Sequence, residues 1–175
     1  MHEEPNWIIK AQHGDQRAFR SLYDANVNAL FRFLRQFSGR SEEVEDWVQR
    51  SFIKAFEHLD TFDGRSRFSS WLFRIALNEM KTDRRRSQAV QFVKADDEFD
   101  LPAATGEQFE WHHTMKTWMT DLDVTKRAVF ILYEVEGYSH SEIASMLDIA
   151  ESSSRTLLMR AKRYLQDRWK KETAL

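Results

Sequence analysis

Apolar side chains recur at intervals of three, four and seven residues along most of this 175-residue chain. This spacing is typical of amphipathic helices, and no stretch shows the alternation expected of a strand. Only five glycines and two prolines interrupt the chain, which favours long helices with few tight turns. The sequence therefore predicts an all-α fold. The spacing is clearest in an early segment that contains Phe19, Leu22, Tyr23, Leu30, Phe33, Leu34 and Phe37.

Capping residues divide the first 86 residues into about four helices. Asp15 predicts a helix start, because its carboxylate can accept hydrogen bonds from the first free backbone amides. Ser41 precedes three glutamates within four residues and indicates a second start, with acids at the positive end of the helix dipole. We expect Ser69 or Ser70 to cap a further helix that ends in the charged run 81–86.

The helical spacing fades between residues 87 and 110, where one lysine stands against six acids. It returns near Met115 and continues through a second helix to about Val135. Ser139 starts a short helix, a tight turn around Asp148 follows, and a last helix runs from about Glu151 to Trp169. The sequence thus predicts two helical domains, 1–86 and 111–175, joined by an acidic linker, 87–110.

Charge and composition limit the class of protein. The formal net charge is −2, divided into +2, −5 and +1 over the three predicted parts, while 152–171 holds seven basic residues and one acid. There is no cysteine, no membrane-spanning apolar run and no apolar secretion segment near the N-terminus, so we expect a soluble cytoplasmic protein. No phosphate loop or catalytic constellation is apparent, and adjacent His112 and His113 lack a distant ligand pair; we expect neither an enzyme nor a metal or other cofactor.

The C-terminal pattern of short helix, tight turn and longer helix is the layout of a DNA-reading helix-turn-helix. Hydroxyls at the start of the last helix allow close approach to phosphates, and Arg155 can bond to two acceptors of guanine. A helical hairpin with a solvated basic face is the alternative. The residues predicted to face DNA are Ser152, Ser153, Arg155, Thr156, Met159, Arg160, Lys162 and Arg163.

Two sequence blocks resemble a known family. The first comprises Glu45-Asp46-Trp47-Val48-Gln49-Arg50-Ser51-Phe52 and Phe68-Ser69-Ser70-Trp71-Leu72-Phe73-Arg74-Ile75-Ala76-Leu77-Asn78, and the second comprises Glu136-Gly137-Tyr138-Ser139-His140-Ser141-Glu142-Ile143-Ala144. They are similar to regions 2 and 4 of extracytoplasmic-function (ECF) sigma factors of the sigma-70 family. The resemblance extends through Arg86, resumes near Thr114 and covers most of the chain. It implies a subunit that directs RNA polymerase to promoters.

The resemblance also implies roles at matching positions in residues 1–86. Core RNA polymerase would contact Glu45, Asp46, Gln49 and Phe52, although these acids also suit a helix N-terminus. The second set would bind the −10 promoter element: Arg65, Arg67, Phe68, Trp71, Asn78, Lys81, Arg84 and Arg85. The last helix would read the −35 element. Aromatic residues at helical spacing are equally expected in a core.

Four positions depart from the family pattern, and one of them is Ser154, which stands where relatives often have valine. Asp148 stands where the turn usually has glycine, and Leu157 replaces a polar group in the last helix. Arg50 stands where an acid is common in the polymerase-binding motif, which predicts weaker or tuned binding.

The resemblance implies an anti-sigma protein as a further partner, beside polymerase and promoter DNA. Two other readings of the sequence remain open here. One is a stand-alone helix-turn-helix repressor or activator, which would bind duplex DNA without polymerase. The other is a helical adaptor without a DNA role.

Overall fold

The computed structural model of the protein describes residues 4–90 and 117–173. Within these ranges all regular structure is helical, which confirms the predicted all-α fold. The chain divides into two compact units, Met1–Glu98 and Phe99–Leu175. Most of the predicted linker, together with His112, His113 and the predicted helix start at Met115, lies outside the described residues.

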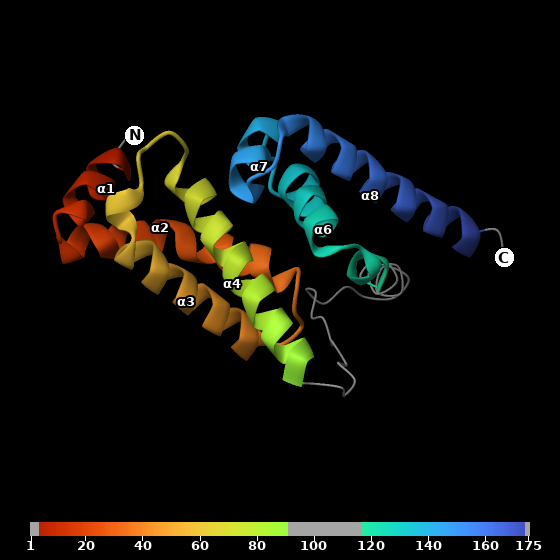
Figure 1. The fold of residues 1–175 in the computed structure, drawn as a ribbon, viewed down its shortest axis with the longest axis horizontal. Coiled ribbons are helices and arrows are strands. Elements are labelled where there is room, and N and C mark those ends of the chain that lie inside the picture. Colours follow the sequence, from red (N-terminus) through yellow and green to blue (C-terminus); the bar gives the residue numbers. More distant parts are fainter. Residues whose placement is uncertain (1–3, 91–116, 174–175) are drawn as a thin grey trace. The chain divides into compact units, whose positions relative to one another are not determined.

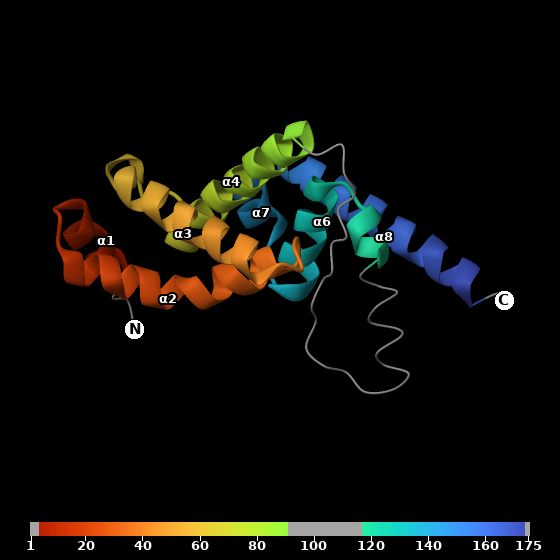
Figure 2. The ribbon, with the colours of Figure 1, turned by 90° about the horizontal axis from the view of Figure 1, so that it is seen from below.

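Between residues 4 and 90, the N-terminal unit consists of four α-helices and one short 3-10 turn (Figure 1). Helix α3 packs against both α2 and α4, and α1 packs along α2. Figure 2 shows α4 at an angle to α2 and α3. The elements are α1 (Glu4–Gln12), α2 (Gln16–Arg35), α3 (Ser41–Glu57), η1 (Leu59–Thr61) and α4 (Phe68–Val90).

The helix starts predicted in this unit are partly confirmed. Asp15 caps α2, because its Oδ1 accepts from the backbone N–H of Arg17 at 2.8 Å and of Ala18 at 3.3 Å. Ser41 is the first residue of α3, with acids in the first turn as predicted.

Helix α4 differs from the prediction at both ends. It begins at Phe68, so Ser69 and Ser70 lie inside its first turn and cap nothing. It continues to Val90, beyond the charged run at which an end was predicted. Arginine and lysine are good helix formers, so a run of them does not stop a helix.

The core of the N-terminal unit is formed where α2, α3 and α4 meet. Aromatic contacts run through it, for example between Phe33 of α2 and Phe73 of α4, whose ring centroids are 4.8 Å apart. The largest fully buried side chains are Trp47, Phe33, Phe37, Phe68, Phe73, Leu22, Leu30, Leu34, Leu59, Leu72, Leu77 and Met80.

The C-terminal unit packs shorter helices on one long helix. Residues 117–121 are helical and precede α6 (Val124–Phe130), which continues as a π-helical turn, η2 (Ile131–Val135). Helices α6 and α7 (His140–Leu147) both pack against α8 (Glu151–Glu172). The buried apolar residues are Trp118, Leu122, Ala128, Val129, Ile131, Leu132, Ile143, Met146, Leu158, Ala161 and Leu165.

The turn between α7 and α8 forms as predicted. Asp148 adopts a left-handed backbone conformation, with φ 54° and ψ 51°, and is the only such residue besides glycines in the described ranges. Ser139 caps α7 through a capping box: its Oγ accepts from the N–H of Glu142, and the Glu142 carboxylate accepts from the Ser139 N–H. The capping box thus starts α7 and the left-handed Asp148 ends it.

Candidate polymerase and promoter interfaces

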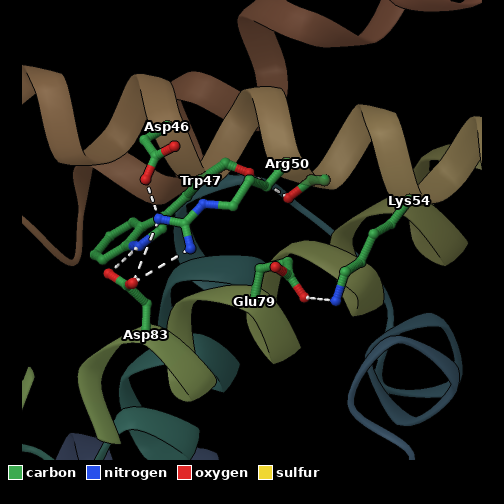
Figure 3. A network of polar contacts seen from close by, with 7 residues as sticks. Asp46, Trp47, Arg50, Lys54, Glu79 and Asp83 are labelled. Atoms are coloured by element: carbon green, nitrogen blue, oxygen red, sulfur yellow. Dashed lines mark hydrogen bonds and ion pairs between the residues drawn. The ribbon is translucent and has the colours of Figure 1, made fainter. Parts of the chain in front are cut away.

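A network of polar side chains joins α3 to α4 (Figure 3). The buried Trp47 donates from Nε1 to Asp83 Oδ2 at 3.0 Å. Both terminal nitrogens of Arg50 lie 3.3 Å from Asp83 Oδ1. One turn further along α3, Lys54 Nζ is 2.5 Å from Glu79 Oε1. Together these contacts set the register between the two helices.

Arg50 also reaches back to Asp46, one turn earlier on α3, and binds its carboxylate. The hydrogen bond to Asp46 is the largest cause that raises the pKa of Arg50, with the charges of Asp46 and Asp83 adding to it and desolvation opposing it. Asp46 is still half exposed, with 51% of its side chain accessible. The Asp46 carboxylate is therefore paired with Arg50 and partly open to solvent at the same time.

The residues predicted to bind polymerase separate into a surface group and a core residue. Glu45, Asp46 and Gln49 are exposed on one side of α3. Phe52 is only 3% exposed and lies between the rings of Tyr23 and Phe56, with centroids at 4.6 and 5.8 Å. This corrects the prediction for Phe52, which packs in the core and does not offer a surface contact.

Helix α4 carries a stripe of polar and basic residues on its outer side. Arg74, Asn78 and Arg85 are exposed and Lys81 is partly exposed. The four positions are separated by four, three and four residues, so they share one face of the helix. We call this set, Arg74, Asn78, Lys81 and Arg85, the outer stripe.

The acids of α4 lie away from the outer stripe. Glu79 and Asp83 face α3, where Lys54 and Arg50 pair with them. The outer stripe is therefore positively charged without an acid between its members. Arg74 was not predicted from the sequence, although it lies four residues before Asn78 and the helical spacing could have identified it.

Three members of the predicted −10 set are engaged inside the unit. Phe68 and Trp71 are 1% and 8% exposed and pack against Phe62, with ring centroids 6.0 and 5.3 Å apart. Arg84 donates to the carbonyl of Phe37 and its guanidinium lies 5.9 Å from the centre of the Trp47 ring. The prediction is corrected for Phe68 and Trp71, because burial of apolar area outweighs exposure of an aromatic ring. Arg84 is partly exposed, and its DNA contact stays a prediction.

Two predicted arginines lie in the loop before α4. Arg65 and Arg67 are both exposed. Arg65 Nε is 3.2 Å from Asp63 Oδ2, and the N–H of Arg65 donates to the same carboxylate at Oδ1. This loop lies directly before the N-terminus of α4 and so next to the start of the outer stripe.

All eight residues predicted to face DNA on α8 are exposed. Ser152, Thr156, Met159 and Arg163 lie on the side of the helix opposite its buried residues. Two of the flanking cations have partners: Arg155 pairs with Glu151, and Lys162 Nζ lies 2.6 Å from Glu134 Oε1. The helix therefore presents hydroxyls, a thioether and cations on one continuous surface.

A contact that was not predicted fixes α7 to α8. Ser154 is fully buried, and its Oγ lies 2.9 Å from Nδ1 of His140, the first residue of α7. The His140 ring stacks on Tyr133 at 4.5 Å. The contact joins residues 14 apart in sequence, so helical periodicity gives no indication of it.

Comparison with known families gives a consistent result for both units. The family model "Sigma-70 region 2" matches residues 22–90, and "Sigma-70, region 4" matches residues 119–165. The RNA polymerase sigma factor NccH of Alcaligenes xylosoxydans xylosoxydans is 33% identical over an alignment of 163 positions that covers 87% of each chain. The protein belongs to the sigma-70 family. It is an ECF sigma factor, and it directs RNA polymerase to promoters.

Further relatives and solved structures are similar to this sigma factor over most of its length. The ECF RNA polymerase sigma-E factor of Haemophilus influenzae is 27% identical over an alignment of 175 positions that covers 92% of both chains. The solved structure of CnrH with the cytosolic domain of CnrY has a TM-score of 0.71 and 29% identity, covering 92% of this chain and 93% of CnrH. RpoE of Bartonella quintana, solved with the anti-sigma factor NepR, has the same TM-score at 24% identity, covering 87% and 96%, and thus shares the fold.

The family and the helices also bear on catalysis and on membrane spanning. Sigma factors are transcription-initiation factors rather than catalysts. None of the helices in residues 4–90 and 117–173 is both long enough and apolar enough to span a membrane.

Proposed function

We propose that the two units divide the work of promoter recognition. The N-terminal part, 1–86 extended to the end of α4 at Val90, docks on core polymerase and holds the melted −10 strand. The C-terminal part, 111–175, reads the −35 duplex, and the rest of the predicted linker 87–110, after Val90, joins them. Linking two weak contacts makes the second effectively intramolecular, so the pair binds far better than either alone.

The observation that carries this proposal is the separation of charge on the N-terminal unit. The acid and amide side chains Glu45, Asp46 and Gln49 lie on α3, while the basic outer stripe with Asn78 lies on α4. The first surface suits a basic protein partner, because complementary charge speeds and orients docking. The second suits a single strand, since cations can follow phosphates and an amide can pair with a base edge.

The exposed side of α8 supports the −35 part of the proposal. Its N-terminal hydroxyls and Arg155 would meet base edges and nearby phosphates in the major groove. Arg160, Lys162 and Arg163 would neutralise the phosphate backbone. The apolar Leu157 is partly buried, which leaves the recognition chemistry to its exposed neighbours.

We also propose an anti-sigma protein as the regulatory partner. The structures of CnrH and of Bartonella RpoE were solved with the cytosolic domain of CnrY and with the anti-sigma factor NepR. A protein that works on polymerase and chromosomal DNA acts in the cytoplasm, and we assign this chain no catalytic role of its own.

Binding of the purified full chain to core RNA polymerase tests the docking surface. We expect saturable binding that Asp46→Lys and Gln49→Ala each weaken. Asp24→Lys is the matched control, because Asp24 is a half-exposed acid that also pairs with an arginine one turn away, Arg20 on α2. Equal loss of binding in the control, or no effect of the α3 substitutions, would overturn the docking surface. Duplex binding without any polymerase binding would favour a stand-alone regulator.

The −10 surface has its own test. Polymerase reconstituted with the chain is titrated with a labelled single strand carrying the promoter −10 element. Asn78→Ala and Arg74→Gln are expected to weaken binding. Asn28→Ala, an exposed amide on α2, should leave it unchanged. Unchanged binding in the α4 variants would remove the outer stripe from the DNA interface.

A further inference from the structure

Arg50 has an unusual position among the charged residues of α3. It is a base within the acid and amide surface formed by Glu45, Asp46 and Gln49. Only 32% of its side chain is accessible, because it lies at the α3–α4 contact and binds acids on both helices. Figure 3 shows its guanidinium between Asp46 of α3 and Asp83 of α4.

The contact with Asp83 holds Arg50 in place. Two nitrogens of the guanidinium lie 3.3 Å from one oxygen of Asp83, while Trp47 binds the other oxygen of that carboxylate at 3.0 Å. A guanidinium fixed in this way is already oriented toward Asp46, so little side-chain entropy is lost in the Asp46–Arg50 pair. Asp46 is thus paired in the free chain by a cation that does not need to be recruited.

A basic surface on polymerase would compete with Arg50 for the same carboxylate. Release of Asp46 would leave Arg50 bound to Asp83, and the contacts of Asp83 with Trp47 and of Lys54 with Glu79 would persist. The exchange therefore needs no change in the packing of α3 against α4.

We propose that Arg50 tunes the affinity for core polymerase. It pairs with Asp46 in the free chain and thereby weakens docking. The inference rests on the proposed role of Asp46 in docking. The Asp46–Arg50 pair would lower the affinity of this sigma factor for polymerase below the value that its acid surface would otherwise give. The chain would then compete less well for a shared pool of core enzyme.

The test measures the dissociation constant of labelled full chain and core polymerase for a set of variants. Arg50→Met keeps an unbranched apolar stem but removes the charge and donors. We expect it to tighten binding about two-fold, the strength of one exposed ion pair at positions i and i+4. Lys54→Met is the matched control, because Lys54 also bridges α3 to α4 but touches Glu79 instead of Asp46. It should change affinity much less.

A double-mutant cycle separates masking of Asp46 from general charge repulsion. In an Asp46→Asn background, Arg50→Met should no longer tighten binding. Equal tightening in both backgrounds would overturn the inference. It would also be overturned if Asp46→Asn weakens polymerase binding but Arg50→Met does not tighten it. In that second case the docking proposal would survive. No effect of Asp46→Asn would overturn both. If thermal melting shows that Arg50→Met does not fold, Arg50→Gln, which keeps an amide donor for Asp83, replaces it with the same expectations.

Discussion

Arg160 offers a quantitative test of which side of α8 faces DNA. It is exposed on the helix, two turns before Arg168. Arg168 is held by Asp121, with Nη2 3.0 Å from Oδ2, and its Nε donates to the hydroxyl of Tyr164 at 3.0 Å. The substitutions Arg160→Gln and Arg168→Gln therefore remove the same charge from one helix, but only the first removes a proposed phosphate contact.

The expected magnitude follows from counterion release. Each phosphate contact contributes ~0.9 to the slope of log K against log salt concentration on duplex DNA. Loss of one contact makes the slope shallower by this amount, so between about 50 and about 200 mM salt the wild type should lose ~3.5-fold more affinity than Arg160→Gln. Arg168→Gln should keep the wild-type slope.

Fluorescence anisotropy of a labelled duplex, titrated with the full chain over this salt range, gives both slopes. Sequence-independent binding is sufficient, because phosphate contacts do not depend on the base sequence. An Arg160→Gln slope equal to that of the wild type would show that this side of α8 does not meet the duplex. An equal change in both variants would attribute the effect to net charge and would refute the reasoning in the same way.

Three predictions concern stability and are checked by thermal and urea unfolding followed by circular dichroism. Ser139→Ala should cost about 1 kcal/mol by removing the α7 cap, whereas Ser145→Ala, within the same helix, should cost less; equal losses would contradict the capping role. Asp148→Ala should destabilise by about 1 kcal/mol because of its left-handed backbone, and Asp148→Gly should not. Leu72→Ala should cost about 2–5 kcal/mol, since the side chain is fully buried; a loss below about 1 kcal/mol would argue against that packing.

The parts of the fold that depend only on residues close together in the sequence could be predicted. Asp15 caps α2 and Asp148 takes the left-handed turn, because both effects are decided within a few residues of the chain. The exposed side of α8 was predicted for the same reason: a helix with a buried stripe presents the opposite side to solvent. The two family motifs placed the whole in the sigma-70 family.

Contacts between distant residues could not be predicted in this way. Trp47 and Arg50 meet Asp83 across more than thirty residues, and His140 meets Ser154 across the turn. Periodicity assigns a residue to a face but does not say which partner stands opposite. Phe52 is an example of a residue that was assigned wrongly for this reason. The family motif marks its position, and only the three-dimensional packing shows that it is buried.

Promoter-directed transcription tests the central claim most directly. Core polymerase, with or without the purified chain, would transcribe genomic DNA fragments in vitro, and the RNA 5′ ends would be mapped. The account predicts a small set of start sites that appear only with the chain, share −10 and −35 elements, and weaken with Asp46→Lys or Asn78→Ala. The account would be contradicted if the chain binds polymerase but the start sites are the same with and without it.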